Sequence, residues 1–141
     1  MGQQQEEVLL ITFAFERERR ILLVRFALDL SRETLTRLDS LVRRFAALEG
    51  PADCIIDFSA VPPGSIDMAL AHERSQQQLV MPGQERVFVA PGDQLFGVLR
   101  VYAARQDKAP LVVRTIDAAY HHYGVAAAGF QLLDIDPAAA V

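Results

Sequence analysis

The stretch RVFVAPGDQLFGVLRVYAAR, residues 86–105, decides the fold class that the sequence predicts. The run 87–90 is apolar at every position, which is typical of a strand covered on both faces in a mostly parallel sheet. Pro91-Gly92 ends this strand, and Asp93 is expected to accept hydrogen bonds from the first free N–H groups of a helix. One apolar stripe predicts that helix: Leu95, Phe96, Leu99, Tyr102 and Ala103. The stretch therefore supplies half of a βαβ unit.

The chain before this stretch begins with two expected strands. Apolar residues alternate over 9–15, and a second apolar run covers 21–28. The charged cluster 16–20 separates them, so the pair is predicted to form an antiparallel hairpin with a solvated tip. A helix is expected over 31–48, with Ser31 as its N-cap, because leucine and phenylalanine recur there at helical spacing.

The remaining elements continue the alternation of strand and helix. A short buried strand is predicted over 53–58, and a helix with little apolar surface over 66–80. After the central stretch, a strand is expected over 111–115. Asp117 is the expected cap of a last short helix, which ends at Gly124.

This order of elements predicts a single α/β domain over residues 1–141, with a mostly parallel central sheet, an antiparallel N-terminal hairpin and helices packed on both faces. Residues 125–135 are expected either to add a short strand or to pack as an arm. The ends, 1–7 and 136–141, are expected to be loose. Gly97 interrupts a good helix at a cost of about 1 kcal/mol relative to alanine, which predicts a close approach of this helix to the sheet or to another subunit.

Composition excludes several classes of function. The chain has 141 residues and a net charge of -4, which argues against general affinity for nucleic acid or anionic membranes. Its N-terminus lacks a signal-type segment, and no apolar run approaches the roughly 20 residues of a membrane helix. A cytoplasmic location is the expectation.

No cofactor, metal site or catalytic signature is expected. Cys54 is the only cysteine and sits in a predicted strand, where it is interpreted as a buried small hydrophobe. His121 and His122 are adjacent, so their side chains diverge by about 100° on a helix and do not suit one metal. There is no GxGxxG and no P-loop. A triad of Ser65, His72 and Asp57 can be assembled on paper, but no nucleophile elbow supports it.

The predicted strand over 53–58 continues into its exit loop as IIDFSAV, residues 55–61. With the order of elements above, this stretch resembles the STAS domain, the fold of bacterial anti-sigma-factor antagonists and of sulfate-transporter tails. RVFVAP (86–91), Phe96-Gly97 with Arg100, and VRTIDAA (113–119) are similar to a bacterial branch of SpoIIAA-like proteins. These are mostly core and turn residues, so the resemblance implies the fold more directly than an activity.

The resemblance would cover residues 9–124, and it implies a protein partner such as a regulatory kinase or an anti-sigma-like protein. In partner-switching members, a serine at the start of the helix after the Asp-Φ-Ser strand is phosphorylated. Here Asp67 takes the place of one motif serine, and Ser65 lies one place before the motif. Ser65 is therefore a candidate regulatory phosphosite, and equally well an ordinary N-cap.

Candidate site residues gather where the predicted parallel strands end. Loops 59–65, 91–93 and 115–117 would meet at the carboxyl edge of the sheet, where open α/β sheets bind ligands. The competing explanation for several of these side chains is helix capping, at about 1 kcal/mol each. The candidates for interaction or regulation are Asp57, Ser59, Ser65, Asp67 and Asp93.

Two functional hypotheses follow. The first is a non-enzymatic interaction and regulatory module of STAS-like fold, which binds a protein partner through residues 62–70 and for which a homodimer is one expected form. The alternative is a small-molecule binding protein, or with less support a hydrolase, that uses a cleft at the carboxyl edge between the loop 59–65 and the helix from Asp93.

Overall fold

The computed structural model of the protein describes residues 11–62, 64 and 68–135. Within these residues the chain forms a six-stranded sheet with the strand order β5-β4-β3-β2-β1-β6. The strands are β1 (Ile11–Glu16), β2 (Ile21–Phe26), β3 (Asp53–Asp57), β4 (Arg86–Val89), β5 (Leu111–Val113) and β6 (Gln131–Leu133). The predicted loose ends, 1–7 and 136–141, lie outside the described residues.

The sheet is mostly parallel, as the sequence predicts. Neighbouring strands from β2 to β5 run in the same direction. β1 is antiparallel to β2, and the two are joined by the charged turn at 17–20. β1 is also antiparallel to β6, with Phe13 opposite Leu133. Of the two alternatives for residues 125–135, the strand is therefore the one that forms.

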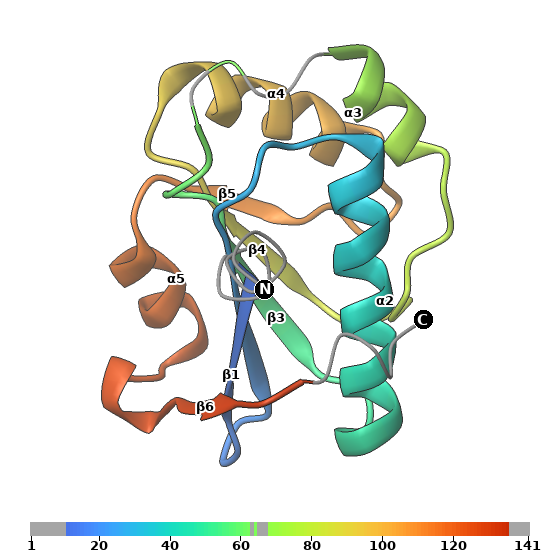
Figure 1. The fold of residues 1–141 in the computed structure, drawn as a ribbon. Helices are drawn as coiled ribbons and strands as arrows, with labels where there is room; N and C mark the ends of the chain where they lie inside the picture. Colours follow the sequence, from blue (N-terminus) through green and yellow to red (C-terminus); the bar gives the residue numbers. More distant parts are fainter. Residues whose placement is uncertain (1–10, 63, 65–67, 136–141) are drawn as a thin grey trace, which may run out of the picture.

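Helices cover both faces of the sheet (Figure 1). They are α2 (Arg32–Glu49), α3 (Met68–Ser75), α4 (Asp93–Ala104) and α5 (Ile116–Tyr123), followed by the 3-10 turn η1 (Ala127–Gly129). α2, α3 and α4 bury side chains in one core cluster, whereas α5 packs against the other face of the sheet. This division follows from right-handed crossovers between parallel strands, which place the connecting helices on the same face.

The main core lies between the sheet and α2. Phe15 and Phe45 are buried almost completely and pack edge to face, with ring centroids 5.2 Å apart. The helix begins where the sequence predicts, because the Ser31 hydroxyl accepts a hydrogen bond from the Thr34 N–H at 3.1 Å. The Thr34 side chain in turn accepts one from the Ser31 N–H at 3.0 Å. This reciprocal cap fixes the direction in which α2 leaves the sheet.

α3 ends five residues earlier than the sequence predicts, at Ser75 instead of Val80. Its last turn tightens, since the N–H groups of Gln76 and Gln77 bond to carbonyls only three residues back. Of its eight residues, only Ala71 is buried. A helix with so little apolar surface gains too little from packing to extend through the glutamines that follow.

The expected caps of α4 and α5 are wrong. Gly92 is the N-cap of α4, and Asp93 lies in the first turn, where its carboxylate pairs with Arg114 instead of capping. Thr115 is the N-cap of α5, because its hydroxyl accepts from the Ala118 N–H at 3.1 Å. Asp117 lies in the first turn of that helix. A side chain caps only if its residue is in extended backbone before the helix, and Thr115 occupies that position.

Gly97 does not mark a close approach to the sheet. It is exposed, and an added Cβ would meet no atom within 4 Å among the described residues. The contact with another subunit stays a prediction. The glycine gives this segment extra backbone freedom in the unfolded chain, and among the described residues nothing packs against the position in return.

Gly97→Ala is therefore expected to raise the free energy of unfolding by about 0.5–1 kcal/mol, because alanine has the higher helix propensity and fits the open space. Urea denaturation followed by circular dichroism measures the change. A clear loss of stability would show that something does pack against this position.

Among the helices of the described residues, none is long and apolar enough to cross a lipid bilayer.

Candidate functional site

A pocket lies between α2, α3, the sheet and the segment 76–84 that links α3 to β4. Its volume is about 120 Å³. Two helices form one side of the pocket: α2 through Leu35, Leu38, Asp39 and Val42, and α3 through Leu70, Ala71 and Arg74. The strands supply Val24, Cys54, Ile56, Arg86 and Phe88. Phe58, directly after β3, and Leu99 and Tyr102 of α4 also line the pocket. Leu30 and the linking segment, through Gln77–Met81 and Gln84, complete the lining.

The early end of α3 explains why this pocket exists. α3 has eight residues and rises about 12 Å. After Ser75 the chain continues without helix until β4, and the apolar side chains that this segment contributes to the lining are Leu79, Val80 and Met81. These three side chains are half-buried. The pocket is therefore a consequence of weak helix formation in the glutamine-rich segment.

The floor of the pocket includes part of a row of aromatic rings. Phe58 packs edge to face with Phe26 and Phe88, at centroid distances of 6.1 and 5.7 Å. Phe88 continues the row to Tyr102, at 5.9 Å. Because each ring is held by its neighbours, the floor is rigid and apolar.

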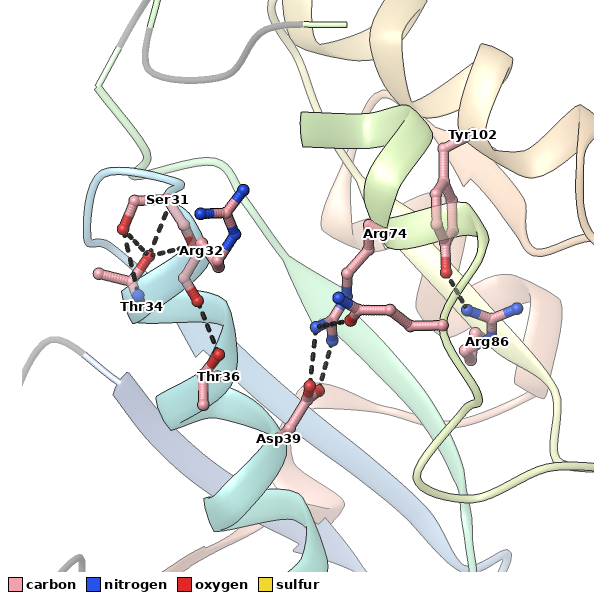
Figure 2. Close-up of polar contacts among 9 residues, drawn as sticks. Ser31, Arg32, Thr34, Thr36, Asp39, Arg74, Arg86 and Tyr102 are labelled. Carbon is pink, nitrogen blue, oxygen red and sulfur yellow. Dashed lines mark hydrogen bonds and ion pairs between the residues drawn. The ribbon is translucent and has the colours of Figure 1, made fainter. Parts of the chain in front are cut away.

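An ion pair joins α2 to α3 at the edge of the pocket. The Arg74 guanidinium donates to both carboxylate oxygens of Asp39, with Nη1 at 2.7 Å from Oδ2. Figure 2 shows the two side chains pointing toward each other from their helices. Only 24% of the Arg74 side chain and 19% of the Asp39 side chain are exposed. Because this bidentate ion pair is largely shielded from water, salt screens its attraction only weakly, and the pair holds α3 against α2.

A second ion pair joins the same two helices at an exposed position. Arg32 donates to the Glu73 carboxylate at 2.6 and 2.9 Å. This hydrogen bond lowers the pKa of Glu73 and raises that of Arg32. Three quarters of the Arg32 side chain is exposed, so water and salt screen the pair.

The two pairs provide a matched test. Asp39→Asn is expected to lower the free energy of unfolding by about 1–2 kcal/mol, because Arg74 then stays half-buried without its counter-charge. Glu73→Gln removes the same charge from the exposed pair and is expected to cost less. Thermal and urea denaturation of both variants measure the difference. Equal losses would mean that burial of the Asp39 pair adds nothing.

Arg86 carries the other charge of the pocket. It is the first residue of β4, is half-buried and lies in register with Cys54 on β3. Its Nη1 donates to the Tyr102 hydroxyl at 3.1 Å, as Figure 2 shows, and Nη2 contacts the Lys108 carbonyl at 3.5 Å. The guanidinium also lies 5.7 Å from the centroid of the Phe88 ring.

Cys54 is buried and lines the pocket, as a small hydrophobe. Burial raises the pKa of its thiol to about 12, and the nearby charge of Arg86 opposes this only in part. The thiol is therefore neutral at physiological pH and is a poor nucleophile.

No model of a known protein family, no curated protein and no solved structure matches this chain.

The residues predicted at the carboxyl edge are held by local partners. The Asp57 carboxylate accepts from the N–H and the hydroxyl of Ser59 at 2.9 and 2.5 Å, which fixes the turn after β3. Asp93 pairs with Arg114 at 2.6 Å, and 95% of its side chain is exposed. Ser65 and Asp67 lie outside the described residues. The role of all five as an interaction site stays a prediction.

The sequence predicted a ligand cleft at the carboxyl edge of the sheet, and it did not predict the pocket between α2, α3 and the sheet. The pocket residues carried weak signals. Asp39 directly follows a core leucine of α2, Arg74 belongs to a polar run, and Arg86 begins an otherwise apolar strand. Only the last of these stands out, because a charge at the start of a buried strand needs a partner or a function. Among the described residues, no group of three or more His, Cys, Asp or Glu side chains is arranged to hold a metal ion.

Proposed function

We propose that this protein binds a small, mainly apolar molecule in the pocket between α2, α3 and the sheet. The observation that carries the proposal is a volume of about 120 Å³ with a mainly apolar lining inside a small domain. Protein interiors are close-packed and contain few voids larger than a water molecule. A pocket of this size accommodates an aromatic ring or a short alkyl chain.

The energetics favour an occupant. Burying the apolar part of a ligand against the mainly apolar lining stabilises the complex by about 25 cal/mol per Å² of apolar surface removed from water. The pocket is partly open, with the Asp39–Arg74 pair at its edge, so a ligand has a route of entry.

A STAS-like architecture remains our proposal for the family. It is supported by the motifs of residues 55–61 and 113–119, and by the order of an N-terminal hairpin followed by βα units. Regulation through Ser65 and Asp67 stays a prediction, and partner binding measured with Ser65→Glu and Asp67→Ala tests it. The described part of the chain gives the pocket the stronger support.

Ligand binding is tested by thermal shift and calorimetric titration with three probes: indole, benzamide and benzoate. A ligand at 100 times its Kd adds about 2.7 kcal/mol of stability, which raises Tm by several degrees in a domain of this size. Ala71→Leu places extra side-chain volume in the pocket and should abolish the shift. Ala69→Leu makes the same change on the same helix at an exposed position and should leave the shift intact.

The proposal fails if none of the three probes raises Tm at millimolar concentration. It also fails if Ala71→Leu, shown to be folded by circular dichroism, binds as well as the wild type. Should Ala71→Leu not fold, Val42→Phe fills the same pocket from α2 and replaces it in the comparison.

A further inference from the structure

The pocket has one charge that its own walls do not neutralise. Among the described residues, three charged side chains line it: Asp39, Arg74 and Arg86. Asp39 and Arg74 are joined as an ion pair, so their charges cancel. Within the part of the chain that the structure describes, Arg86 forms no ion pair with a carboxylate. A half-buried guanidinium without a counter-charge makes the pocket attractive to an anion.

Tyr102 adds a hydrogen-bond donor beside this charge. Its hydroxyl oxygen accepts from Arg86 Nη1 at 3.1 Å, so the hydroxyl proton is left to donate to another group. The ring is buried and lines the pocket. Arg86 has five N–H donors, of which the Tyr102 hydroxyl and the Lys108 carbonyl take one each. Donors therefore remain on both side chains.

We propose that the ligand of this pocket is a small apolar carboxylate, whose carboxylate group is bound by Arg86 and Tyr102 and whose apolar body lies against Phe58 and Leu38. This inference rests on the proposed function and specifies the ligand class for the same site. The planar fork of arginine matches the two oxygens of a carboxylate, and a single cation neutralises a single negative charge. The hydrocarbon walls then enclose an aromatic or short alkyl group.

The test compares benzoate with benzamide, which have the same ring and nearly the same shape but differ in charge. Calorimetric titration at low salt is expected to give a Kd at least 10-fold lower for benzoate in the wild type. Arg86→Met keeps the length of the side chain without its charge. This variant should lose the preference for benzoate while it still binds benzamide, which shows that the pocket is intact. Arg86→Lys keeps the charge without the planar fork and should retain part of the preference.

Arg100→Met is the matched control, because Arg100 is exposed on α4 and does not line the pocket. It should keep the full preference for benzoate. The inference is overturned if wild type binds benzoate no more tightly than benzamide, or if the preference survives in Arg86→Met. In either case, the proposed function still stands if benzamide binds the wild type and does not bind Ala71→Leu. If none of the probes binds, both the proposed function and this inference are overturned.

Discussion

Replacing Phe58 with alanine is expected to lower the free energy of unfolding by about 3–5 kcal/mol. Phe58 is 6% exposed and stands directly after β3, in the middle of the aromatic row that floors the pocket. The substitution removes a whole ring and leaves Phe26 and Phe88 without their shared contact. Because rigid strands hold these neighbours, they relax only partly into the space. Urea denaturation monitored by circular dichroism measures the loss.

Leu48→Ala provides the control for this prediction. Leu48 is also a large apolar residue, but 54% of it is exposed near the end of α2. Its replacement is expected to change stability by no more than about 0.5 kcal/mol. A similar loss in both variants would mean that the ring row does not form the rigid centre of this core.

Cys54 is expected to react with a disulfide reagent such as DTNB at least about 1000-fold more slowly in the native protein than in the unfolded one. Its pKa rises from 9.0 to about 12 through burial, so at pH 8 the reactive thiolate is about 1000-fold scarcer. The reaction is followed by absorbance with and without denaturant. In a Cys54→Ala background, Ala104→Cys gives an exposed thiol that should react fast without denaturant.

The same shift in pKa predicts an alkaline loss of stability. The folded-state pKa of Cys54 lies above the unfolded value, so its contribution is fully present below pH 9 and is lost as the pH rises toward about 12. Burial also raises the pKa of Tyr123, so this side chain adds a further loss of stability at alkaline pH. Cys54→Ala should make stability fall less steeply above pH 9. An unchanged pH profile together with fast labelling of the native thiol would contradict the burial of Cys54.

Local signals in the sequence predicted the elements that are strongly patterned. α2 was predictable from its cap at Ser31 and from leucines at helical spacing, and β4 from an apolar run ended by Pro91-Gly92. Helix caps were less predictable. Asp93 and Asp117 both have side chains able to cap, but each lies in the first turn of its helix. Gly92 and Thr115 occupy the N-cap positions, because the backbone at the end of the preceding strand decides which residue precedes the helix.

By itself, the sequence determined the fold class of the described residues: an α/β fold whose parallel strands alternate with amphipathic helices, because periodicity of apolar residues is a local property. Only the tertiary structure decided where the pocket lies and which charges face it. Asp39, Arg74, Arg86 and Tyr102 come from α2, α3, β4 and α4, and no spacing along the chain brings them together. Their meeting depends on the order of the parallel strands and on the crossovers that place α2, α3 and α4 on one face of the sheet, which are long-range contacts that no local pattern specifies.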